Sequence, residues 1–175
     1  MTMLLKVAAT LALTLSIATS WADEPEPANK YQAVYVSKVA VEADMDRTSP
    51  EEVKYYADIE TEATTKITQW FKDEGFTIAD TPDAATDGLA IINTKVLFNA
   101  GNRALRWVGS FMGAGKATAD VTMEAIDSKY GTKVTSQNAK DSLRIGNLGG
   151  SASSMLMGTI GTAWNYVVAD INELK

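Results

Sequence analysis

Four residues in the middle of the chain could bind a negatively charged group: Arg103, Arg106, Trp107 and Lys116. Guanidinium and ammonium groups hold phosphates and carboxylates by charge-assisted hydrogen bonds, and an exposed indole offers a flat surface for stacking. No acid occurs from residue 88 through residue 119, so nothing within this stretch neutralises the bases. The segment predicts a site for an anionic partner, and the alternative is that its bases pair with the chain's own acids.

Three glycines, Gly109, Gly113 and Gly115, stand among these bases. With the lysine that follows they approach the G-x-x-x-x-G-K-[ST] phosphate loop. Ser110, however, replaces the first glycine, and Ala117 replaces the hydroxyl that would bind magnesium. Glycines also serve where a chain changes direction between two strands. We therefore interpret the three glycines as a hinge.

The absence of Cys and His excludes most side-chain catalysis. A Cys nucleophile, a His general base, a disulfide and a zinc site of the usual kind are all impossible. Adjacent carboxylates such as Glu51 and Glu52 are the remaining acid–base pairs, of the type that hydrolyses glycosidic bonds. In a segment this acidic such pairs arise by chance. The sequence thus predicts no catalytic residue, no metal site and no cofactor.

The amino terminus has the features of a secretory signal peptide. Lys6 precedes an apolar run that is shorter than the roughly 20 residues of a membrane span, and Ser20-Trp21-Ala22 is a small-x-small cleavage site. We expect cleavage after Ala22, a flexible leader over 23–30 and one domain over 31–175. The predicted location is the periplasm, which leaves nucleic acid out of the expected partners.

The rest of the chain predicts an α+β fold. Ser49 followed by proline, and glycine at position 75, mark the start and end of one helix, and a continuous apolar stripe predicts a second helix over 152–173. Apolar or alternating runs predict strands over 31–41, 76–79, 89–98, 116–126 and 132–138, the last at an edge. This order suggests a two-layer sandwich: a mainly antiparallel sheet with both helices on one face.

Small residues line one side of the last predicted helix, at Ser154, Gly158 and Gly161. Such a stripe allows close approach of another backbone. It predicts either tight packing on the domain's own sheet or an interface with a helix of another chain.

Several of these features occur in a fixed order: the glycine segment at 104–117, the alternating strand that ends at Asp127, the turn at 131–134 and Gly149-Gly-Ser151 before the last helix. In this the chain resembles a bacterial envelope family, domain of unknown function 4410, over nearly the whole mature domain. The resemblance implies an exported αβ domain and no particular activity. Many members look like lipoproteins with a cysteine after the signal, and this chain has none.

The function expected from these features is that of a non-enzymatic periplasmic binding or envelope-assembly module. Its expected partner is an envelope protein, an anionic envelope glycolipid or a second copy of the chain. The alternatives are an envelope polysaccharide hydrolase with paired carboxylates and a self-assembling structural component.

Overall fold

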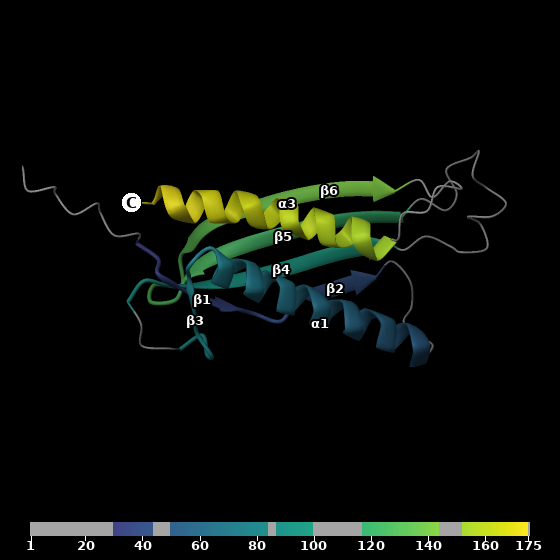
Figure 1. Ribbon diagram of the computed structural model, residues 1–175, viewed down its shortest axis with the longest axis horizontal. Helices are drawn as coiled ribbons and strands as arrows, with labels where there is room; N and C mark the ends of the chain where they lie inside the picture. The colour runs from purple at the N-terminus through teal and green to yellow at the C-terminus, as the bar shows by residue number, and fades with distance from the viewer. Residues whose placement is uncertain (1–29, 44–49, 84–86, 100–116, 144–151, 175) are drawn as a thin grey trace, which may run out of the picture.

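The computed structural model describes residues 30–43, 50–83, 87–99, 117–143 and 152–174. Within these ranges two long helices lie on one face of a six-stranded sheet, so the fold has two layers (Figure 1). The α+β class with both helices on the same face is thereby confirmed.

Three long strands make up most of the sheet: β4 (Leu89–Asn99), β5 (Ala117–Asp127) and β6 (Lys133–Leu143). They form two antiparallel ladders of ten residue pairs each. The strand β6 is the edge, as predicted, and it runs five residues beyond the predicted end at residue 138.

The other side of β4 carries short parallel strands. Both β1 (Ala33–Val36) and β2 (Ala40–Ala43) pair with β4, one after the other, and β3 (Thr77–Ile78) adds to β1. The sheet is therefore mixed, with the antiparallel ladders the longer ones.

The single strand predicted over 31–41 is divided in the structure. Residues 37–39 belong to neither β1 nor β2, and the Val39 amide donates to the hydroxyl of Thr64 at 3.0 Å. A helix side chain thus replaces the strand partner that this amide would otherwise need. The sequence pattern missed the break because Val39 is buried like a strand residue.

The helix α1 (Pro50–Asp73) matches the predicted helix. Its inward stripe is buried, and its outward side carries the ion pairs Lys54–Asp58 at 2.6 Å and Lys66–Glu62 at 2.9 Å. The chain then passes through Gly75 at φ 91°, the left-handed conformation that favours glycine after a helix.

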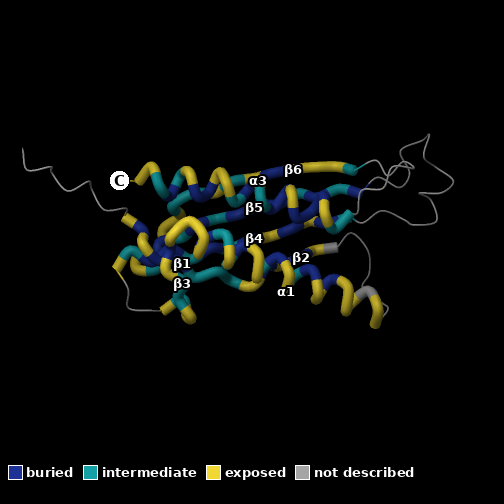
Figure 2. The backbone as a smooth tube through the Cα atoms, in the orientation of Figure 1, coloured by how far each residue is buried: buried dark blue, intermediate teal, exposed yellow. Residues whose placement is uncertain are grey.

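The helix α3 (Ala152–Glu173) has the predicted bounds and lies over β5 and β6. The two helices meet through aromatic side chains, since the rings of Trp70 and Trp164 are 5.5 Å apart. The core lies between helices and sheet, and Figure 2 shows the buried positions alternating with less buried ones along the strands. In β5 the buried row faces the helices, and the residues between form an open, partly solvated face, as the alternation predicted.

Candidate functional site

The ends of four strands meet at one end of the sheet. Backbone pairing sets Ala43 beside Phe98 and Asn99 beside Thr118. Ala117 pairs in turn with Leu143 across β5 and β6. The connections 44–49, 100–116 and 144–151 therefore all leave the described fold at this end, on the right of Figure 1. We call it the connection end.

The predicted partner-binding residues Arg103, Arg106, Trp107 and Lys116 belong to the second of these connections and lie outside the described residues, as do the hinge glycines. The structure describes where their segment begins and ends, at Asn99 and Ala117, and these two positions are on adjacent strands.

The predicted small-residue stripe of α3 divides into two parts. A Cβ at Gly161 would lie 3.6 Å from the ring of Trp70, an ordinary van der Waals contact, so this part of the stripe faces α1. A Cβ at Gly158 would meet nothing within 4 Å, and both Gly158 and Ser154 are exposed. Gly161 therefore faces α1, whereas the helix surface at Gly158 is open among the described residues.

A hollow of about 490 Å³ lies beside the exposed part of this stripe, between α3 and the edge strand β6. Four consecutive β6 residues, 138–141, form one wall. Gly158, Thr159, Thr162 and Tyr166 form the other. The smallest side chains of the two walls are those of Ala139 and Gly158. The hollow depends on how α3 crosses β6, which no local sequence pattern predicts.

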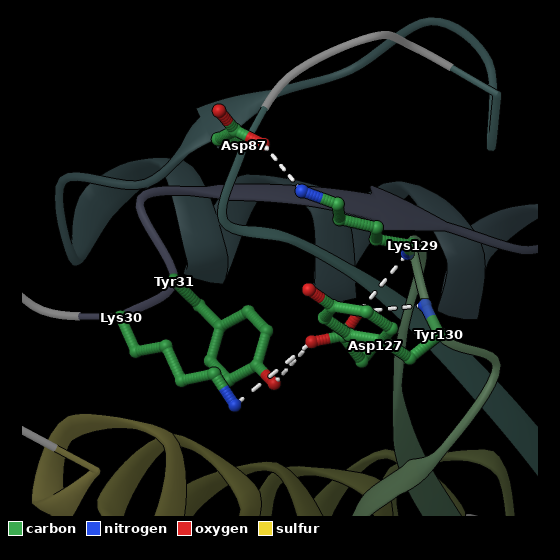
Figure 3. A network of polar contacts seen from close by, with 6 residues as sticks. All are labelled: Lys30, Tyr31, Asp87, Asp127, Lys129 and Tyr130. Atoms are coloured by element: carbon green, nitrogen blue, oxygen red, sulfur yellow. Dashed lines mark hydrogen bonds and ion pairs between the residues drawn. The ribbon is translucent and has the colours of Figure 1, made fainter.

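A buried carboxylate, that of Asp127, lies at the opposite end of the sheet, where Asp127 pairs with Ala90. Figure 3 shows its polar contacts. Asp127 is the last residue of the buried row of β5 and is 6% exposed. Its Oδ2 accepts a hydrogen bond from the Tyr31 hydroxyl at 2.9 Å, and its Oδ1 accepts from the amides of Lys129 and Tyr130 at 2.9 and 3.0 Å. The exposed Lys30 Nζ lies 3.9 Å from Oδ2. Asp127 thus joins the start of the described fold to the β5–β6 turn.

The electrostatics of Asp127 favour its charged form. Burial alone would raise the pKa of this carboxyl, but the hydrogen bonds from the Tyr31 hydroxyl and from two turn amides outweigh burial, so the pKa is lowered. Desolvation raises the pKa of the Tyr31 phenol, which therefore remains a donor. Asp127 is a site residue that the sequence patterns did not predict. The available signal was a charged residue at a position where the alternation predicts an apolar one.

Two further carboxylates on the open face have lowered pKa values. The Lys140 ammonium, 2.6 Å away, and the Asn138 amide lower the pKa of Asp120, and Lys133 lowers the pKa of Glu124. A general acid for glycoside hydrolysis needs the opposite shift. Asp120, Glu124 and Asp127 are therefore set up to stay ionised and to pair.

The described residues contain no group of three or more acids that could hold a metal ion. Among the described helices, none has the length and apolarity that crossing a membrane requires.

Neither a protein-family model nor a curated protein matches the sequence. Among solved structures, the PelC dodecamer from Paraburkholderia phytofirmans is 15% identical over 77% of this chain and 86% of that chain, with a TM-score of 0.50. A point variant of that dodecamer gives 14% identity, coverage of 82% and 90%, and a TM-score of 0.49. The LpoB C-terminal domain from Salmonella enterica is 7% identical over 66% of this chain and 86% of that chain, with a TM-score of 0.35. At 15% identity and a TM-score of 0.50, the first PelC structure shows that this chain has a similar fold.

Proposed function

We propose that the chain is an exported, non-enzymatic binding module of the bacterial cell envelope that contacts an anionic partner at the connection end of its sheet. The predicted signal peptide and the resemblance to the envelope family support the location. The chemistry of the partner follows from the distribution of charge between the described fold and its connections.

The observation that carries the proposal is the register that brings the ends of β2, β4, β5 and β6 together. The described residues contain no arginine. All four arginines of the chain, Arg47, Arg103, Arg106 and Arg144, occur in the three connections that begin at this end, together with Lys116. The acids in these connections are Asp44 and Asp46.

Arginine suits such a role because its planar guanidinium binds phosphate or carboxylate through two parallel hydrogen bonds. The rest of the chain is acidic enough that the whole molecule carries a net charge of −6. A partner with dense negative charge is therefore repelled by the body of the protein and attracted to the connection end, which orients its approach.

The test replaces Arg103, Arg106 and Lys116 together with Gln. The matched control replaces three exposed lysines of α1, Lys54, Lys66 and Lys72, which removes the same charge elsewhere. The probes are vesicles with and without an anionic phospholipid, vesicles with a phosphorylated envelope glycolipid, and soluble polyglutamate as the acidic-protein arm.

We expect the first triple variant to lose binding to an anionic probe and the control to retain it, with both unfolding at the wild-type temperature. The probe that binds identifies the source of the anionic group. Wild-type protein that binds none of the probes, or equal losses in the two variants, would overturn the proposal.

A second candidate, a self-assembling component, is favoured by the uncharged side of α3 beside the hollow. The PelC structure is described as a dodecamer. Light scattering of the purified chain tests this candidate directly.

A further inference from the structure

One long side of the molecule carries little charge on its exposed helix surface. From residue 154 to residue 169 the outward residues of α3 along this side are exposed and uncharged, namely Ser154, Gly158, Thr162, Asn165, Tyr166 and Ala169, and the acid Glu173 follows at the end of the helix. They follow one another at three- and four-residue spacing, so they form a continuous strip. We call this strip the α3 edge face. The exposed side of α1, by contrast, carries ion-paired acids and lysines.

The strand beside this face, β6, is the edge of the sheet. Every second residue of an edge strand directs its amide and carbonyl away from the sheet, where another strand can pair with them. At the other side of the sheet α1 covers such groups, since Thr64 and Glu60 accept hydrogen bonds from the amides of Val39 and Val41 at 3.0 and 3.4 Å. Beside residues 138–141 of β6 the hollow takes the place that a covering helix side chain has at the other edge.

Lysines on an edge strand usually discourage pairing with another chain. Both lysines of β6 are engaged within the sheet, Lys140 with Asp120 at 2.6 Å and Lys133 with Glu124. The one register irregularity between β5 and β6 lies near Lys133, which leaves residues 135–143 as a regular edge. Among the described residues no further strand pairs with this edge, and its charged residues are Lys140, which is paired, and the exposed Asp141.

We propose that the α3 edge face and residues 135–143 of β6 form an interface with a second copy of this chain, in which the two β6 strands pair antiparallel about a twofold axis. The hollow receives atoms of the second copy. A small molecule and a partner of another sequence are the alternative occupants.

The charges favour a second copy. Two molecules of net charge −6 repel each other, so they approach with least cost through a surface that carries little charge. The walls of the hollow hold Lys140, which pairs with Asp120, and Asp141, which has no ion pair among the described residues. A strongly charged partner finds only this single carboxylate there.

The β6 sequence is also compatible with pairing to itself. In an antiparallel pairing centred on Ala139, equal offsets set Lys140 opposite Asn138 and Asp141 opposite Gln137 of the second copy. No two like charges are opposed in this arrangement. An isologous contact of this kind closes after two copies.

The test compares two identical substitutions, Thr162→Glu on the α3 edge face and Thr65→Glu on the exposed side of α1. Both threonines are exposed, and each donates its hydroxyl to the carbonyl four residues earlier, at 3.1 and 2.8 Å. The two substitutions therefore remove the same local bond and add the same charge. Circular dichroism and thermal unfolding establish that both variants fold.

Sedimentation over a range from micromolar to near-millimolar protein measures self-association. We expect the wild-type chain and Thr65→Glu to dimerise alike, and Thr162→Glu to weaken the dimer by about tenfold or more, because it sets like charges face to face. A wild-type chain that stays monomeric over this range would overturn the proposal, as would equal dissociation constants for the two variants.

A second measurement uses the absence of Cys from the chain. Cysteine in place of Gly158, where an added Cβ meets nothing within 4 Å, gives a single reactive point on the proposed interface. A short bis-maleimide is expected to cross-link Gly158→Cys into dimers and to leave Thr65→Cys monomeric. Equal cross-linking of the two would contradict the interface. The charge-removal variants of the connection end should leave the dimer intact, so the two proposals fail independently.

Discussion

The hydroxyl of Tyr31 donates a hydrogen bond to the carboxylate of Asp127 at 2.9 Å, although the two residues are 96 positions apart in the chain. Both side chains are buried, and the carboxylate also accepts two amides of the turn that follows it. This bond fastens the first described residues of the fold to the β5–β6 hairpin. Loss of this hydrogen bond should therefore lower the stability of both segments.

We predict that Tyr31→Phe lowers the free energy of unfolding by about 1 kcal/mol and Asp127→Ala by about 3 kcal/mol, because the alanine variant also leaves two turn amides without their acceptor. Lys30→Gln should change it by less than about 0.5 kcal/mol, since this lysine is exposed. Urea unfolding measures all three values. If the Tyr31→Phe and Asp127→Ala effects simply add in the double variant, the bond is not the source of the stability.

Acid should weaken the same network. The pKa of Asp127 is lower in the folded chain than the value of about 3.9 in an unfolded chain. Its contribution is therefore present above that unfolded value and is lost as the pH falls through the lower folded one. We expect the urea concentration at the midpoint of unfolding to decrease once the pH is lowered below about 4. In Asp127→Asn this decrease with pH should be less steep. An identical pH dependence in the variant would assign the acid sensitivity elsewhere.

Two buried threonines should respond in opposite ways to replacement by valine. Thr94 is 4% exposed and its hydroxyl has no hydrogen-bond partner among the residues that the structure describes, whereas the hydroxyl of Thr159, 3% exposed, donates to the Met155 carbonyl at 2.9 Å. Because an unpaired buried hydroxyl is costly, Thr94→Val should stabilise the chain by about 1 kcal/mol. Thr159→Val should be neutral or destabilising. Calorimetric unfolding compares the two, and destabilisation by Thr94→Val would show that the hydroxyl is satisfied in solution.

Alanine should be tolerated unequally at two glycines with positive φ. A Cβ at Gly88 (φ 75°) would lie 2.5 Å from the carbonyl oxygen of Lys30, while a Cβ at Gly131 (φ 63°) meets nothing within 4 Å. Gly131→Ala should cost only the conformational penalty of about 1–2 kcal/mol, and Gly88→Ala should cost clearly more, because the backbone must also move. Thermal unfolding at neutral pH measures the loss of stability in each variant. Equal losses would mean that the contact with Lys30 relaxes freely.

Local sequence patterns were sufficient to predict the longest helices and strands. The apolar stripe of α3 and the strict alternation of β5 bury a row of side chains against a second layer, and each row can be recognised from spacing alone. Gly75 likewise marks the end of α1. These features depend on neighbours within one or two turns of the chain, which the sequence displays directly.

The features that the sequence did not predict depend on contacts between distant segments. At the break between β1 and β2 the Val39 amide donates a hydrogen bond to Thr64 of α1. The Asp127 network includes Tyr31, which is distant in the sequence. The hollow exists only because α3 and β6 lie side by side. The predicted binding segment lies in the connection 100–116, beyond the described residues, so its role stays a prediction.

The parallel pairing of β1 with β4 also fixes an order of assembly. Strands β4, β5 and β6 pair with their neighbours in sequence, but Ala33 pairs only with the distant Thr77 and Leu89. Contacts between segments so far apart form late, since long loops are slow to close. A chain emerging amino terminus first therefore exposes its first strand until the middle of the domain has followed. During that interval the newly delivered polypeptide is most open to chaperones and proteases.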